Sequence, residues 1–172
     1  MILIKTHNRF IKTKIPAPGT NKIIKSLEKS ESKSMQGQLP IVWSKAEGHS
    51  LFDIAGNKFI DFTSTIFVAN IGHSNANLIK NLKKTLDKKL LHSYAYFNDS
   101  REKYLKNLVK FAGKNFEKAF LMSAGTEATE AALKLMRLHG QKLKKRKLGI
   151  ICIDGNWHGR TMGAQMMSGN KK

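Results

Sequence analysis

The sequence predicts an α/β protein in which a small antiparallel unit precedes the first part of a mostly parallel sheet. The first observation lies in residues 41–62, where short apolar runs separated by turn residues are typical of antiparallel strands. The second lies in residues 118–154, whose pattern predicts a strand, a helix and another strand in succession. That order is the crossover unit of a parallel sheet.

Three parts are expected along the chain. Residues 1–40 are expected to form an extended N-terminal arm, because prolines and glycines interrupt a weak periodicity, with one short helix near residues 22–29. Residues 41–75 form the antiparallel unit, and Gly56-Asn57 between two apolar runs predicts a hairpin. Residues 76–172 then form the first part of a larger domain.

The larger part shows the helical and apolar patterns of an α/β domain. Leucines recur at every fourth position over residues 78–90, and a second helical pattern covers residues 102–111. Residues 118–122 and 148–154 are short apolar runs that we expect to be strands. Alanines and leucines between them make a helical stripe, which Gly140 is expected to end as a C-cap.

Composition sets limits on the class of protein. Apolar residues make up 41% of the chain, which excludes a fully disordered polar polypeptide. The 31 Lys+Arg against 12 Asp+Glu give a formal net charge of +19, which raises the question of nucleic-acid binding. Arginines are few and the lysines are dispersed, so a solvated surface is favoured over a nucleic-acid partner.

Cellular location is inferred from three features of the sequence. No stretch approaches the roughly 20 apolar residues of a spanning helix, so no membrane partner is expected. The N-terminus lacks the charged-then-apolar order of a signal peptide, although a basic transit-like segment is an alternative. Cys152 is the single cysteine, which excludes a disulfide within the chain and fits a cytoplasmic protein.

The first candidate site is the turn from the strand at 118–122 into the following helix. Small residues at a helix N-terminus leave backbone N–H groups unpaired, and the helix dipole favours an anion there. Gly125 allows a ligand to approach the backbone closely. The Thr126 hydroxyl can cap the helix or donate a hydrogen bond to a phosphate. The alternative is an ordinary strand-to-helix turn capped by Thr126.

The second candidate site follows the strand at 148–154. In the segment GNWHGRT, Trp157 offers an aromatic face to a flat ligand, and His158 can donate a hydrogen bond. The alternative is a turn whose tryptophan packs into the core. Because the carboxyl ends of parallel strands meet at one edge of a sheet, we expect the two segments to lie close together. An anion site beside an aromatic face indicates a phosphorylated planar cofactor.

Four segments resemble the class III aminotransferases, the pyridoxal-phosphate enzymes of fold type I. FLMSAGTEATEAALKLMR resembles the family's phosphate cup, and NWHGRTMGA resembles the segment whose aromatic ring stacks on the cofactor. LFDIAGNKFIDF and NIGHSNANLI resemble its N-terminal hairpin and Gly-His segment. The resemblance runs from about Trp43 to Lys172 and implies the N-terminal part of this fold.

The resemblance also implies roles for individual residues. Gly125 and Thr126, with Ala124 beside them, would bind the phosphate of pyridoxal 5'-phosphate through backbone N–H groups and the Thr126 hydroxyl. Trp157 would stack on the cofactor ring, and His158 would support it. The substrate pocket would include one further residue, Phe67. No metal ligands are expected.

Several positions depart from the family pattern. Ala124 stands where serine is common, Thr65 where glycine is common, and Asn75-Ala76 where His-Pro is usual. The family's cofactor-binding lysine and the aspartate that pairs with the pyridine nitrogen come far downstream of the HGRT segment. We therefore assign no catalytic residue, and expect the chain to be an N-terminal portion that is inactive in isolation.

The resemblance implies an aminotransferase that moves an amino group from an amine or amino acid to an oxo acid or aldehyde, and that forms a homodimer when complete. An aminomutase or racemase of the same family is an alternative. A degenerate basic protein that binds polyanions, and the non-functional product of a truncated gene, are two further alternatives.

Overall fold

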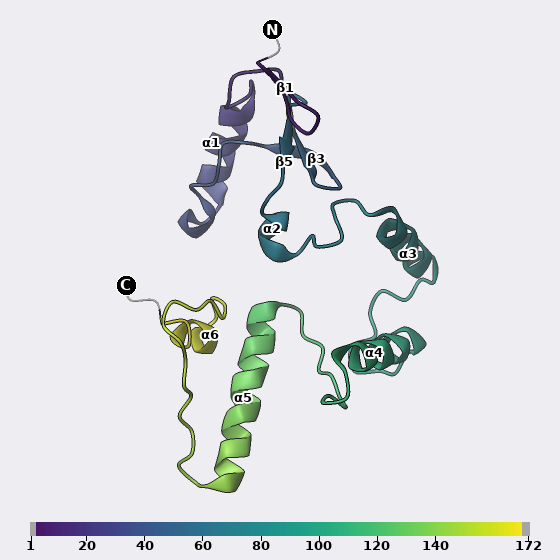
Figure 1. The fold of residues 1–172 in the computed structure, drawn as a ribbon, viewed down its shortest axis with the longest axis vertical. Coiled ribbons are helices and arrows are strands. Elements are labelled where there is room, and N and C mark those ends of the chain that lie inside the picture. Colours follow the sequence, from purple (N-terminus) through teal and green to yellow (C-terminus); the bar gives the residue numbers. More distant parts are fainter. Residues whose placement is uncertain (1–2, 170–172) are drawn as a thin grey trace. The chain divides into compact units, whose positions relative to one another are not determined.

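A computed structural model describes residues 3–169 of the chain (Figure 1). Its contacts divide it into two compact units, one up to His92 and one from Ser93 onward. The first unit contains an antiparallel sheet and two of the longer helices, and the second contains two long helices and one short helix. Each unit is described by itself.

The first unit is built on a five-stranded antiparallel sheet with the strand order β1-β2-β5-β4-β3. The hairpin predicted at Gly56-Asn57 is confirmed, because it joins β4 to β5 and Gly56 has a φ of 74°. The N-terminal arm adds two strands that its weak periodicity did not reveal. The strands are β1 (Ile4–Lys5), β2 (Phe10–Ile11), β3 (Trp43–Glu47), β4 (Ser50–Asp53) and β5 (Lys58–Ile60).

A buried asparagine fixes the arm to the sheet. Asn57 has no exposed surface, and its Oδ1 accepts hydrogen bonds from the backbone N–H groups of Lys12 and Thr13 at 2.7 and 3.2 Å. Its Nδ2 donates to Asp53 Oδ2 at 2.7 Å and to Thr13 Oγ1 at 2.9 Å. Because every polar atom of this buried side chain is paired, the arm and the hairpin are held in one arrangement.

The helices of the first unit follow the sequence pattern closely. The short helix expected near residues 22–29 is α1 (Thr20–Ser30), and a 3₁₀ turn follows at Lys33–Met35. The leucine-rich pattern becomes α3 (Ala76–Asp87). Its N-cap is Asn75, whose side chain accepts the N–H groups of Asn77 and Leu78 at 3.1 Å each. The departure at Asn75 therefore supplies one of the best N-cap residues.

The second unit contains three helices, α4 (Asp99–Ala112), α5 (Gly125–Leu143) and α6 (Met162–Met166). The first two confirm predicted helices, but the expected C-cap at Gly140 is wrong. Helix α5 continues past this glycine to Leu143, and Gly140 is buried. An added Cβ there would overlap the Lys147 carbonyl oxygen, so the glycine permits a close backbone approach instead of ending the helix.

The two strands expected in the second unit are not formed. Residues 118–122 and 148–154 have no strand pairing, so the sheet of the described residues is antiparallel only. Phe120 and Ile153 are largely exposed, and Ile151 is fully exposed. A strand needs a neighbour to satisfy its backbone N–H and C=O groups, and within residues 3–169 neither apolar run has one.

Between residues 3 and 169, no helix combines the length and the apolar character needed to cross a membrane.

Candidate functional site

The N-terminus of α5 has the open backbone that the first candidate site requires. Its N-cap is Ala124, which offers no side-chain oxygen to the helix, so the alternative in which Thr126 caps the helix is wrong. The first N–H groups of a helix, here those of Gly125 and Thr126, have no partner within the helix. No atom lies within 4 Å of a Cβ added at Gly125, so a ligand could approach this backbone closely.

The second candidate segment lies directly against the first. A Cβ added at Gly159 would lie 2.5 Å from Thr126 Cβ and 3.0 Å from Thr126 Cα, so only a glycine allows this contact. Gly159 also has a φ of 126°, in the region that favours glycine. Two residues further on, the Thr161 N–H donates to Thr126 Oγ1 at 3.3 Å. The structure therefore brings the two predicted segments together at the start of α5.

Two hydroxyls and a carboxylate form a directed chain of hydrogen bonds at this contact. Thr161 donates its hydroxyl proton to Glu130 Oε1 at 2.6 Å. Because that proton is used, the 2.9 Å contact between the two threonine Oγ1 atoms requires Thr126 to be the donor. The Thr126 hydroxyl proton is therefore directed at Thr161 and not, as the resemblance implied, at a phosphate, while the Thr126 backbone N–H stays available for a ligand.

Glu130 is the end point of this chain and also the partner of α6. Its Oε1 accepts the N–H groups of Gly163 and Ala164 at 2.8 and 3.1 Å. The Thr161 hydroxyl, followed by these two backbone N–H groups, holds the pKa of Glu130 below its ordinary value. The carboxylate is therefore charged at neutral pH, and it satisfies donors that the short helix α6 leaves without an intrahelical partner.

Trp157 and His158 precede this contact. Trp157 is 66% exposed, and the Arg160 guanidinium lies 5.5 Å from the centroid of its ring. His158 is half-buried and is anchored through its backbone, whose N–H donates to Ser168 Oγ at 3.2 Å. Ser168 in turn donates to the Ala164 carbonyl at 2.9 Å, which ties this loop to α6. An exposed aromatic face in a loop that contacts an open helix N-terminus fits a flat, phosphorylated ligand.

Phe67 lies in the other unit, at the end of the turn α2 (Ser64–Phe67), and is 78% exposed. All four residues of this turn have positive φ, from 47° at Ser64 to 69° at Phe67. This is a left-handed turn, which costs L-residues roughly 1–2 kcal/mol each. Thr65, which stands where the family commonly has glycine, is in this conformation with φ 55° and ψ 45°.

Sequence reasoning missed Glu130 and Thr161 as parts of the site. A usable signal existed for Glu130, because residues four apart on a helix lie on the same face and Glu130 follows Thr126 by four. Thr161 lies in the HGRT segment, but its partner on α5 could not be read from spacing along the chain.

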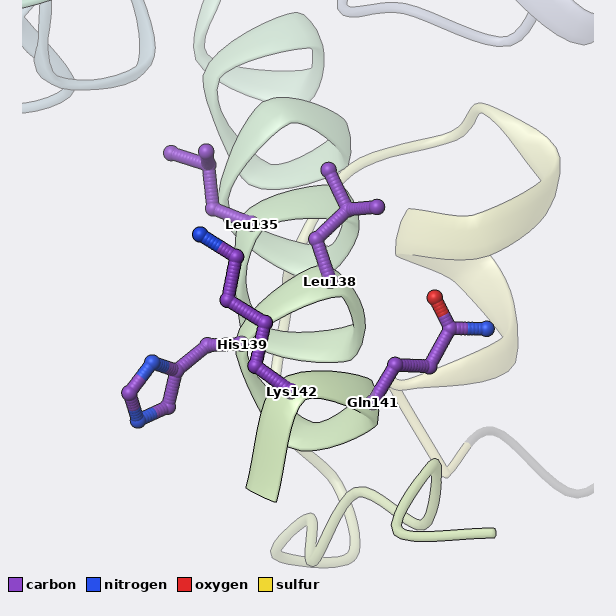
Figure 2. Close-up of a pocket in the computed structure, with 5 residues that line it drawn as sticks. All are labelled: Leu135, Leu138, His139, Gln141 and Lys142. Carbon is purple, nitrogen blue, oxygen red and sulfur yellow. The ribbon is translucent and has the colours of Figure 1, made fainter. Parts of the chain in front are cut away.

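The C-terminal half of α5 carries a surface depression that is separate from this site. Figure 2 shows its lining side chains projecting from the helix, and none of the predicted site residues is among them. The depression is lined by Leu135, Leu138, His139, Gln141 and Lys142.

Comparison with known proteins supports the resemblance seen in the sequence. The family model "Aminotransferase class-III" matches residues 32–172. An acetylornithine aminotransferase of Clostridium acetobutylicum is 37% identical over 150 residues, which cover 85% of this chain and 38% of that protein. A mitochondrial ornithine aminotransferase of Oryza sativa is 33% identical over 152 residues, covering 87% and 32%. The chain thus spans about a third of the length of the curated relatives it matches.

Solved structures agree with this assignment. The acetylornithine aminotransferase of Elizabethkingia anophelis matches with a TM-score of 0.70 and 28% identity, covering 85% of this chain and 36% of that one. A taurine:2-oxoglutarate aminotransferase of Bifidobacterium kashiwanohense, solved with PLP and glutamate, shares the fold with a TM-score of 0.72 at 23% identity, covering 88% and 33%. This chain belongs to the class III aminotransferase family.

Proposed function

We propose that the chain is the part of a pyridoxal-phosphate-dependent aminotransferase that holds the cofactor phosphate and one face of its ring. The proposed reaction moves an amino group from ornithine or acetylornithine, the compounds in the names of its relatives, to an oxo acid. The observation that carries the proposal is the contact of Gly159 with Thr126, which joins an open helix N-terminus to an exposed aromatic loop.

In this proposal each site residue has a defined task. The backbone N–H groups of Gly125 and Thr126 bind the phosphate, and Ala124 leaves that cup one hydroxyl short of the family pattern. Trp157 packs against the ring, and His158 holds the loop through its backbone bond to Ser168. When bound, pyridoxal 5'-phosphate supplies an electron sink for the carbon that carries the amino group. The substrate side is assigned to Phe67.

The proposal gives this chain a binding task. It assigns proton transfer to residues in the part of the relatives that this chain does not match. The matched residues cover only 38% and 32% of these two relatives, so the complete activity, its substrates and assembly as a homodimer are proposed for the whole enzyme. We place the reaction in the cytoplasm, which suits a chain whose lone Cys152 is unpaired and exposed.

The test is the affinity of the chain for pyridoxine 5'-phosphate compared with pyridoxine. These probes lack the aldehyde, so they do not react with the many surface lysines. A Trp43→Phe background leaves Trp157 as the sole tryptophan reporter. We expect saturable quenching of Trp157 and at least tenfold tighter binding of the phosphorylated probe. Equal binding of both probes, or no change in Trp157 emission, would overturn the proposal.

A polyanion-binding role is the second candidate, because the net charge is +19. It predicts binding to single-stranded DNA that weakens steeply with salt. It also predicts no preference for pyridoxine 5'-phosphate over inorganic phosphate. Titrations with pyridoxine 5'-phosphate, inorganic phosphate and single-stranded DNA, each at two salt concentrations, separate the two candidates.

A further inference from the structure

We propose that Glu130 is a positioning residue for the cofactor site, and that it orients Thr126 through Thr161. The proposal rests on the proposed function, because it concerns how the phosphate cup and the aromatic loop are held together. It assigns Thr126 two tasks on different atoms, with the hydroxyl holding the loop and the backbone N–H facing the ligand.

The first step of the argument is the convergence of donors on one atom. Glu130 Oε1 accepts the Thr161 hydroxyl at 2.6 Å and two backbone N–H groups of the α6 N-terminus at 2.8 and 3.1 Å. These donors lie 31 to 34 residues further along the chain. One carboxylate oxygen on α5 therefore fixes the whole turn from Thr161 to Ala164.

The second step is the close approach of Gly163 to this carboxylate. A Cβ added at Gly163 would overlap Glu130 Oε2 and would lie 2.8 Å from Leu133 Cδ2. Ala164, the next residue, is fully buried. The turn therefore contacts this face of α5 through Gly163 as well as through its hydrogen bonds to Glu130.

The third step concerns the Thr126 hydroxyl. The bond from Thr161 to Glu130 uses the only hydroxyl proton of Thr161, so Thr126 must donate to Thr161 and accepts the Thr161 N–H in return. Without the carboxylate, Thr161 could donate to Thr126, and the Thr126 hydroxyl would be free to rotate. Glu130 therefore determines both the direction of this bond and the position of the loop that carries Trp157.

The experiment compares Glu130→Ala, Glu130→Gln and the matched control Glu117→Ala in the Trp43→Phe background. Glu117 is an exposed glutamate of the same unit. Glutamine can place its carbonyl oxygen where Oε1 accepts all three bonds, so it tests geometry apart from charge. One readout is the affinity for pyridoxine 5'-phosphate, and the other is amide hydrogen exchange at Thr161 in the absence of any ligand.

We expect Glu130→Ala to weaken pyridoxine 5'-phosphate binding by about tenfold and to accelerate exchange at the Thr161 amide. A residue that only caps α6 would affect exchange at Gly163 and Ala164 but would leave Thr161 protected by Thr126. We expect Glu130→Gln to restore most of both readouts, and Glu117→Ala to change neither.

A double-mutant cycle with Thr126→Val completes the test, because that variant removes the hydroxyl and keeps the backbone N–H. We expect Thr126→Val with Glu130→Ala to bind the probe no more weakly than the more impaired of the two single variants, since both break the same chain of bonds. Additive losses would overturn the proposal, as would a Glu130→Gln variant as impaired as Glu130→Ala. If the parent chain does not bind the probe, the proposed function fails, whereas Thr161 exchange still tests Glu130.

Discussion

His73 Nε2 lies 2.7 Å from the Asp61 carboxylate, and this pair closes the base of the segment that carries Phe67. Both side chains are nearly buried, with 4% of Asp61 and 14% of His73 exposed. The backbone of His73 also exchanges two hydrogen bonds with Gly48, at 2.8 and 2.9 Å. The turn between the two residues is therefore held at both ends.

The pair of Asp61 and His73 predicts that the first unit loses stability in acid. The hydrogen bond from His73, and then that from the Thr63 hydroxyl, lowers the pKa of Asp61 from 3.8 to about 2. The folded unit binds fewer protons than the unfolded chain in this range, so the stabilisation is complete above about pH 4 and disappears as the pH falls toward 2.

We expect the stability of the first unit to fall over this pH window by more in the parent chain than in Asp61→Asn. Urea unfolding followed by Trp43, in a Trp157→Phe background, reports on the first unit alone. Equal pH dependence in the two proteins would contradict the role given to Asp61. At neutral pH, Asp61→Asn is expected to cost about 1.5–3 kcal/mol, because it weakens bonds to a charged acceptor.

Thr65→Gly is expected to stabilise the first unit by about 0.5–1 kcal/mol, because Thr65 is β-branched and lies in the left-handed region at φ 55°. Part of the relief is offset by the greater freedom of glycine in the unfolded chain. The control is Thr85→Gly, the same exchange within the right-handed helix α3, which is expected not to stabilise. Urea unfolding of both variants distinguishes strain from a general effect of glycine.

Gly159→Ala is expected to separate the aromatic loop from α5, because an added Cβ would overlap the Thr126 side chain. The bond from the Thr161 N–H to Thr126 would then be lost, and its amide would exchange faster. Gly149→Ala is the matched control, since no atom lies within 4 Å of a Cβ added there. Unchanged protection of Thr161 in Gly159→Ala would show that the close contact is not required.

The apolar segment at 148–154 is expected to drive self-association of the isolated chain. Ile151 is fully exposed and Ile153 is 72% exposed, on backbone that pairs with no strand among the described residues. Ile151→Lys should therefore shift the chain toward monomer in sedimentation velocity. Phe111→Lys, which removes an aromatic residue that is 90% exposed on α4, should have a smaller effect. A larger effect of Phe111→Lys would point to non-specific apolar association.

The sequence was informative where the determining contacts are local. The leucine spacing predicted α3, and the Gly56-Asn57 turn predicted the β4–β5 hairpin, because helix faces and tight turns depend on neighbours along the chain. The prediction of strands at 118–122 and 148–154 was wrong, because apolar character does not by itself supply a pairing partner. The two-residue strands β1 and β2 are too short to carry a periodic signal.

The same division applies to the candidate site. The motifs predicted that the start of α5 and the Trp157 segment would meet, and the Gly159–Thr126 contact brings them together. Their roles toward a cofactor stay predictions. The bonds from Glu130 to residues 161, 163 and 164 depend on how a loop folds back onto a helix, which spacing alone does not encode.

The Asn57 network has a consequence for how the protein is made. All the strands of the sheet, and the residues that Asn57 joins, lie between residues 4 and 60. This segment is synthesised before the rest of the described chain, and its pairing needs nothing from residues beyond 60. The sheet can therefore form on the nascent chain, with β2, β4 and β5 paired on both sides, before the apolar runs near residues 120 and 150 are translated.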